Sequence, residues 1–107
     1  MSLDFHLSCT IYTTVLDENI THNLCQMARE AGVYDALWEP YKHGYTKAGQ
    51  IVPILCEGLE RLERDPERYR KFDAENGYGT YPCFVESVKR VLAACREYPD
   101  ADIEANR

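Results

Sequence analysis

The chain carries LDFHLSCTIY at residues 3–12, a stretch in which apolar and polar side chains alternate. Successive side chains of a β-strand point to opposite faces of the sheet, so this alternation predicts a strand with one buried face. Residues 13–15 extend the pattern up to an expected polar turn at Asp17 and Glu18. A lone strand is marginal in water, so the rest of the chain has to supply a partner strand and a cover.

The partner strand is predicted at the other end of the chain. Residues 101–106, ADIEAN, alternate weakly and are expected to pair with the N-terminal strand. Helices then have to cover the apolar face of this pair.

The segments in between have the apolar spacing of helices, with an apolar residue every three or four positions. The first predicted helix is capped by Asn19 and ends at Gly32, and a short second segment runs from Val33 to Trp38. A loop is expected at residues 38–47.

The second half of the chain predicts further helices with proline near their starts. Thr46 is expected to cap a helix that Pro53 either kinks or delays to a start near Gln50, and the apolar stripe favours the kink. Asp65 precedes a short helix, and Thr80 is expected to cap the last one.

These expectations define the fold class. We predict an α+β fold in which residues 1–107 form a single, mainly helical domain, with about four helices packed on a small pair of N- and C-terminal strands. A length of 107 residues with 45% hydrophobic residues is consistent with one core.

The composition argues against several functional classes. A net charge of −6 argues against general nucleic-acid binding. No apolar run reaches the length of a membrane span, and no lipidation motif suggests an anchor. Five cysteines without a Cys-x-x-Cys pair indicate reduced thiols and a cytoplasmic location. Two of them, Cys56 and Cys95, lie on apolar helix faces and are expected to pack in the core.

The most suggestive polar cluster is Asn19-Ile20-Thr21-His22-Asn23. At the start of a helix the free backbone N–H groups favour an anion or another polar ligand. Asn19, Thr21, His22 and Asn23 are therefore candidate ligand-binding residues. In the simpler alternative Asn19 only caps the helix, Ile20 is core, and His22 and Asn23 are solvated.

The second candidate segment is the loop at residues 38–47, which combines aromatic rings with positive charge. Such a mixture suits a planar, negatively charged ligand such as a nucleotide. Trp38 also follows the apolar pattern and is expected to be buried. Tyr41 and Tyr45 are equally consistent with packing on the core and with stacking on a ligand. The candidate ligand-binding residues here are Trp38, Tyr41, Lys42, Tyr45 and Lys47.

Metal binding and catalysis have weaker signals. His22 and Cys25, three residues apart, need a further ligand such as His6 or His43, and zinc sites usually show paired ligands. A hydrolase would place Cys25 or Cys83 beside His22 or His43, with a third group to orient the imidazole. We therefore expect no metal and no cofactor and assign no catalytic residue; enzymatic activity stays open, with a non-enzymatic role favoured.

Several short motifs resemble those of short uncharacterised proteins encoded by bacteriophages and prophages. They are Asn19-Ile20-Thr21-His22-Asn23-Leu24, Met27-Ala28, Ala31-Gly32, Leu37-Trp38-Glu39-Pro40, Asp65-Pro66-Glu67-Arg68 and Glu75-Asn76-Gly77-Tyr78-Gly79-Thr80-Tyr81. The chain departs from the family pattern at residues 41–45, at Cys25 and in its acidic tail. The resemblance implies an accessory protein inside an infected bacterial cell that binds a host enzyme, or a nucleotide signal of host defence, and blocks it.

The leading hypothesis is thus a phage-type accessory binding protein that binds or sequesters a small polar or nucleotide-like ligand between the first helix and the 38–47 loop. One alternative is a protein-interaction module that inhibits a host protein. The other is a small His/Cys-dependent hydrolase. The oligomeric state stays open, and the N-terminal strand, which is expected to be an edge strand, offers a route to a homodimer.

Overall fold

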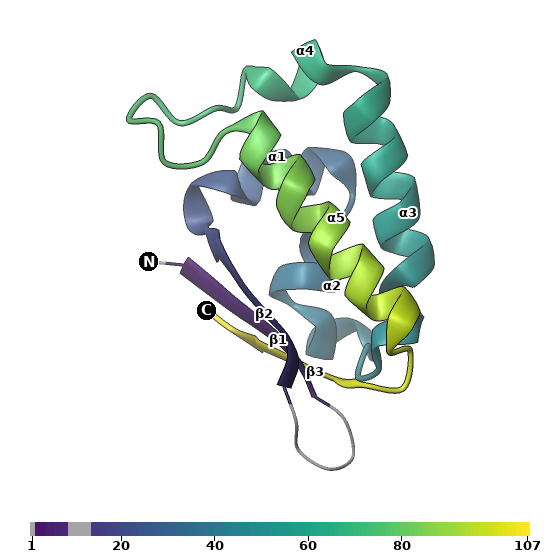
Figure 1. The fold of residues 1–107 in the computed structure, drawn as a ribbon. Coiled ribbons are helices and arrows are strands. Elements are labelled where there is room, and N and C mark those ends of the chain that lie inside the picture. The colour runs from purple at the N-terminus through teal and green to yellow at the C-terminus, as the bar shows by residue number, and fades with distance from the viewer. Residues whose placement is uncertain (1, 9–13) are drawn as a thin grey trace.

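Three strands form one antiparallel sheet in the order β2-β1-β3. The computed structural model describes residues 2–8 and 14–107. The strands are β1 (Ser2–Ser8), β2 (Thr14–Thr21) and β3 (Asp102–Asn106), and β1 lies between the other two (Figure 1). The predicted pairing of the N-terminal and C-terminal segments is confirmed.

The strand β2 is the main departure from the sequence-based expectation. Asp17 and Glu18 were expected in a turn and Asn19 at a helix cap, but all three lie inside β2 and pair with β1. The N-terminal strand is central, so the expectation that it is an edge strand is wrong. Residues 9–13 of the predicted strand lie outside the described residues.

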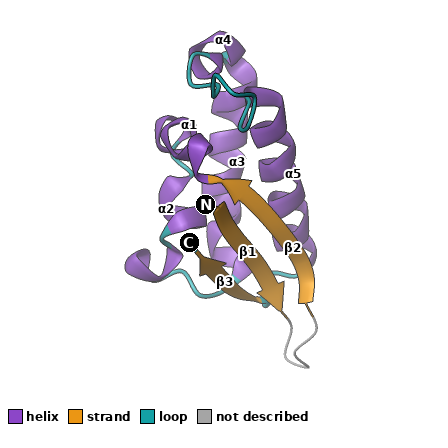
Figure 2. Cartoon of the chain, turned by 90° about the vertical axis from the view of Figure 1, so that its left-hand side faces the viewer, coloured by secondary structure: helices purple, strands orange, loops and turns teal. Residues whose placement is uncertain are grey.

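The helical segments pack on one face of this sheet and leave the other face open (Figure 2). They are η1 (His22–Leu24), α1 (Cys25–Ala31), α2 (Tyr34–Trp38), η2 (Pro40–His43), α3 (Ala48–Arg64), α4 (Pro66–Arg70) and α5 (Tyr81–Glu97). The first helix therefore begins after Thr21 rather than at Asn19. The predicted loop at residues 38–47 contains the short 3-10 helix η2.

The long helix α3 begins at Ala48 and contains Pro53, so the late start near Gln50 is wrong. Its predicted cap is also wrong, because Lys47 occupies the N-cap position. The side-chain oxygen of Gln50 accepts the backbone N–H groups of Thr46 at 2.7 Å and Lys47 at 2.9 Å. A side chain from the first turn therefore satisfies donors that precede the helix.

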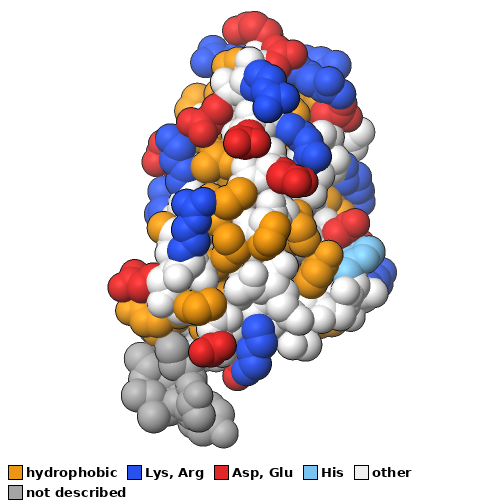
Figure 3. All heavy atoms as spheres, turned by 90° about the vertical axis from the view of Figure 1, so that its right-hand side faces the viewer, with side chains coloured by type: hydrophobic (Ala, Val, Ile, Leu, Met, Phe, Trp, Pro, Cys, Tyr) orange, Lys and Arg blue, Asp and Glu red, His pale blue; other side chains and the backbone are white. Residues whose placement is uncertain are grey.

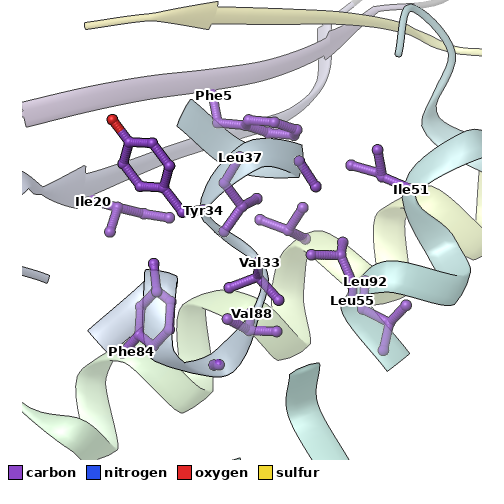
Figure 4. Close-up of a cluster of buried hydrophobic side chains, with 14 of the residues drawn as sticks. Phe5, Ile20, Val33, Tyr34, Leu37, Ile51, Leu55, Phe84, Val88 and Leu92 are labelled. Carbon is purple, nitrogen blue, oxygen red and sulfur yellow. The ribbon is translucent and has the colours of Figure 1, made fainter. Parts of the chain in front are cut away.

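The core lies between the inner face of the sheet and the helices (Figure 4). Phe5 from β1, Leu37 from α2 and Phe84 from α5 are fully buried in it. Cys95 is buried as predicted, whereas Cys56 is only half-buried at the edge of the core.

The face formed by α3 and α5 lies opposite the open face of the sheet. Apolar side chains gather in the middle of it, with acidic and basic side chains around them (Figure 3). Among the described residues, no helix combines the length and the apolar character needed to cross a membrane.

Candidate binding cleft

A cleft of about 500 Å³ lies between the end of β2 and the turn that precedes α5. Residues 19–21, 23 and 24 form one wall, and residues 76–79 with Cys83 and Ser87 form the other. This volume falls in the usual range of ligand-binding sites.

The turn at residues 76–79 is fixed against the start of η1. The side-chain amide of Asn23 donates to the carbonyl oxygen of Tyr78 at 2.8 Å, and the Asn76 side chain accepts the Tyr78 N–H at 3.0 Å. Gly79 has a positive φ of 113°, and a Cβ there would lie 3.0 Å from Cγ2 of Thr21. A residue without a side chain therefore lets the two walls meet.

The lining of the cleft is uncharged and mixes polar with apolar groups. Its side-chain hydrogen-bonding groups are amides and hydroxyls, and no Lys, Arg, His, Asp or Glu is among the described lining residues. Tyr78 is 73% exposed at the rim. Such a lining suits a ligand that offers uncharged donors and acceptors, with Tyr78 as a stacking surface.

Asn19 and Thr21 both reach the cleft, but not as the sequence predicted. The Asn19 side chain donates to Ser2 Oγ and to Asp4 Oδ1, each at 2.8 Å, on the open face of the sheet. Thr21 is the residue that caps, since its hydroxyl oxygen accepts the Asn23 N–H at 3.3 Å. The cap predicted at Asn19 thus lies two residues later.

His22 and Trp38 lie together, away from the cleft. The indole N–H of Trp38 donates to Nδ1 of His22 at 2.9 Å, and Tyr34 stacks on the indole with ring centroids 5.5 Å apart. Trp38 is only 2% exposed, which confirms the expected burial and leaves little of the ring free to stack on a ligand.

Tyr41 closes the outer edge of β3, although about half of its surface is exposed. Its hydroxyl donates to the carbonyl oxygen of Ile103 and accepts the N–H of Ala105, both at 3.0 Å. Tyr45 is half-buried against the core, and its ring stacks with that of His43.

The two predicted lysines are each paired within the chain. Lys42 contacts Glu39 at 2.9 Å, and Lys47 forms an ion pair with Asp102. The strand register places Thr21 opposite Ser2, and Asp102 opposite Ser8, six residues further along β1. At about 3.3 Å per residue, Lys47 lies roughly 20 Å from Thr21.

The structure therefore divides the predicted residues into separate groups. Asn19, Thr21 and Asn23 share the cleft. His22 pairs with Trp38. Of the remaining residues, Tyr41 and Lys47 contact β3, Lys42 contacts Glu39, and Tyr45 stacks with His43. Ligand binding by any of them stays a prediction.

Glu18 and Ser87 lie beside the cleft and were not predicted as a functional pair. The Glu18 carboxylate is buried. It accepts hydrogen bonds from the Ser87 hydroxyl at 3.1 Å and from Nε and Nη2 of Arg90 at 3.0 and 2.6 Å. These hydrogen bonds to Glu18 raise the pKa of Arg90. The cluster joins β2 to α5 and fixes the spacing of the two walls.

The cysteines and histidines do not assemble a reactive centre in the described part of the chain. Cys83 is exposed and lines the cleft, but no histidine lines it too. Burial raises the pKa of the Cys25 thiol, against smaller opposing effects of Arg29 and Arg107. No group of three His, Cys, Asp or Glu side chains among residues 2–8 and 14–107 is placed to hold a metal ion.

Asn76, Tyr78 and Ser87 line the cleft and were not predicted from the sequence. The Asn76-Gly77 pair signals a turn. Its partner Asn23, however, comes more than fifty residues earlier in the chain. Only the tertiary fold brings these two segments together.

No protein-family model matches the chain, and no curated protein and no solved structure is significantly similar to it. The resemblance to bacteriophage proteins stays a prediction.

Proposed function

We propose that this chain is a non-catalytic binding protein that holds a polar, uncharged part of its ligand in the cleft between β2 and the 76–79 turn. The observation that carries this proposal is the uncharged lining of a cleft of about 500 Å³. Asn76 and Thr21 would supply hydrogen bonds, and the exposed ring of Tyr78 would stack on a planar group.

The absence of charge among the described lining residues narrows the ligand class that was first expected. Lys42 and Lys47 were expected to offset the charge of a nucleotide, but Lys47 is roughly 20 Å from Thr21 by strand geometry. A phosphate in the cleft would lack a cationic partner there. A nucleobase, a nucleoside or a peptide amide fits the lining better.

A catalytic role has less support. A cysteine nucleophile needs an adjacent base, and the described lining residues include Cys83 but no histidine. From the resemblance we further propose that the ligand or partner is a host component met inside an infected bacterium.

The position of Cys83 gives a direct test of this site. The full chain is screened by thermal shift against nucleosides, nucleotides and short peptides, and the alkylation rate of each cysteine is then measured by mass spectrometry. A true ligand should slow alkylation of Cys83 and leave that of Cys56, which lies on α3 and contacts Arg96 of α5, unchanged.

A matched pair of variants completes the test. Tyr78→Ala removes the rim ring and should weaken binding by roughly tenfold, the value of a stacked aromatic contact. Tyr98→Ala removes an exposed tyrosine at the far end of α5 and should leave binding unchanged. A stabilising compound that leaves the Cys83 rate unaltered would place the binding site elsewhere.

A further inference from the structure

We propose that the cleft receives an extended peptide segment of a partner protein, which adds as a further strand to the free edge of β2. This inference rests on the proposed function and names the class of ligand. It follows from the direction of the backbone groups of β2.

The outer edge of β3 shows which backbone groups point away from β1. The N–H of Ile103 donates to the carbonyl oxygen of Thr46 at 2.9 Å, and the N–H of Ala105 donates to the Tyr41 hydroxyl. In an antiparallel pair, alternate residues exchange both of their hydrogen bonds with the neighbouring strand. The residues of β3 that bond to β1 are therefore the alternate set, Asp102, Glu104 and Asn106.

The same alternation fixes the direction of the groups in β2. Asp4, His6 and Ser8 of β1 face β3, so the backbone groups of Leu3, Phe5 and Leu7 face β2. Their register partners are Ile20, Glu18 and Leu16. The N–H and C=O groups of Asp17 and Asn19, and the N–H of Thr21, therefore point outward.

These outward groups have no hydrogen-bond partner within the described part of the chain. The opposite edge differs, because Tyr41 and Thr46 close β3 and the N–H of Ala48 bonds to Ala101 at 2.9 Å. The chain thus closes one edge of its sheet and leaves the other open. An open row of backbone groups is a template for another strand.

The cleft borders this open edge. Asn19 from the outer face and Ile20 from the inner face both line it, as expected where the edge itself faces the cavity. Ile20 and Leu24 offer apolar contact to an inward side chain of the added strand. Asp17 on the outer face is exposed, although its carboxylate lies 3.7 Å from Nε2 of His6, and it favours a basic side chain opposite. Because Ile20 and Asp17 are three residues apart, the peptide should carry an apolar and a basic residue at that same spacing.

A second copy of the chain fits this edge less well. When two β2 strands pair antiparallel with their faces preserved, the central residue lies opposite itself. A register centred on the strand's middle therefore places either Asp17 or Glu18 opposite its own copy, and opposed like charges destabilise a sheet. The register centred on Asn19 avoids this repulsion, but it pairs only residues 17–21 of β2. A peptide from a different protein avoids the repulsion and can pair along the whole strand.

The experiment starts from a displayed library of random peptides about ten residues long, selected on the full chain. An enriched peptide is then synthesised in two forms, each N-methylated at alternate residues. Only one of the two alternating sets of N–H groups bonds to β2, so one form should bind as the parent does and the other should lose at least roughly tenfold in affinity. The parent should also protect Cys83 from alkylation.

The protein variants test the same edge from the other side. Asn19→Pro removes an N–H that points away from β1 and should weaken binding by roughly tenfold or more, with the fold checked by thermal unfolding. Asp4→Ala removes the carboxylate that holds the Asn19 side chain and should leave binding unchanged. If Asn19→Pro does not fold, the two methylated peptides still decide the question.

The remaining outcomes overturn the inference in distinguishable ways. Equal binding by both methylated peptides excludes strand addition. If no peptide is enriched while a small molecule protects Cys83, the proposed function stands and the peptide inference falls. A bound peptide that does not protect Cys83 contradicts the peptide inference and leaves the proposed function to be decided by the small-molecule screen. A concentration-dependent dimer in sedimentation that Asn19→Pro dissociates would assign the edge to a second copy.

Discussion

The hydrogen bond between Trp38 and His22 shows how one contact decides the role of two candidate residues. Trp38 is the one tryptophan of the chain and is buried, and its indole N–H donates to the imidazole of His22. A buried donor without an acceptor costs about 1–3 kcal/mol. His22 therefore serves the fold first, whatever else it contacts.

His22→Ala should lower the free energy of unfolding by about 1–3 kcal/mol, because the Trp38 N–H loses its acceptor. Urea unfolding followed by the fluorescence of Trp38 measures this change. His43→Ala, which removes an exposed imidazole 3.5 Å from Asp35, is the control and should cost less than about 0.5 kcal/mol. Equal costs for the two variants would contradict a structural role for His22.

Cys95 predicts a pH dependence of stability. Burial raises the pKa of its thiol from 9.0 to about 12. The unfolded chain ionises this thiol above pH 9 while the folded chain keeps it neutral, so this contribution to stability is complete below pH 9 and decreases as the pH rises toward 12. The expected loss is about 1.4 kcal/mol per pH unit in this window.

Urea unfolding of the wild type from pH 8 to about pH 10.5 checks this slope. Cys95→Ala should be less stable at pH 8 because of its cavity, but its stability should fall less steeply with pH. Cys83→Ala, which removes an exposed thiol, should keep the slope of the wild type. If the stability of Cys95→Ala fell with pH as steeply as that of the wild type, the pH dependence could not come from the Cys95 thiol.

At the scale of elements, β2 is the strand that the sequence patterns did not predict. Leu16 and Ile20 mark its inner face, but Glu18 stands between them and breaks the apolar alternation. Acidic residues and asparagine are unfavourable in strands, and Asn19 is a typical cap residue. The strand forms because β1 pairs with it and Arg90, 72 residues away, neutralises Glu18. Such a distant partner leaves no local signal, whereas the long helices α3 and α5 have one in their apolar spacing.

Tyr41→Phe should loosen the outer edge of β3. The substitution removes the hydroxyl that bonds to Ile103 and Ala105, at a cost of about 1 kcal/mol. Amide exchange of Ala105 should become faster, while amides of α5 should exchange as in the wild type. Tyr98→Phe, at an exposed tyrosine, is the control and should alter neither.

Gly58 lies where α3 packs closely against the turn that precedes α2. A Cβ at this position would lie 2.2 Å from Cγ1 of Val33. Gly58→Ala should therefore destabilise the fold by about 1–3 kcal/mol, even though alanine favours helices by about 1 kcal/mol. The clash is with a side chain, so the same substitution should cost less in a Val33→Ala background. Equal costs in a double-mutant cycle by urea unfolding would exclude this contact as the cause.

At the scale of the whole molecule, the candidate site is harder to predict than the fold. The sequence identified Asn19, Thr21 and Asn23 as a polar group, and all three line the cleft. It could not identify the second wall, because the 76–79 turn meets them only in the tertiary structure. It also grouped Lys47 with them, because the sequence does not show that the two segments lie at opposite ends of β1.

The two layers of the molecule are connected at the cleft by the ion pair of Glu18 and Arg90. The carboxylate is buried on β2, whereas the guanidinium reaches it from α5 and is about half exposed. Exposure of the guanidinium to solvent reduces the contribution of the ion pair itself to the free energy of unfolding. Removing one partner is still costly, because a buried carboxylate would lose several hydrogen bonds.

Arg90→Ala should therefore destabilise the fold by about 1.5–3 kcal/mol in urea unfolding. Lys89→Ala is the matched control, because Lys89 precedes Arg90 on α5 and contacts surface carboxylates at 3.7 and 3.8 Å. This substitution should cost less than about 0.5 kcal/mol. Glu18→Gln in the Arg90→Ala background should restore part of the loss, because a neutral amide is less costly to bury than an unpaired carboxylate. If it restores nothing, the cost of Arg90→Ala comes from lost packing on α5 and not from the charge of Glu18. The spacing of the cleft walls would then depend on packing between the layers rather than on this ion pair.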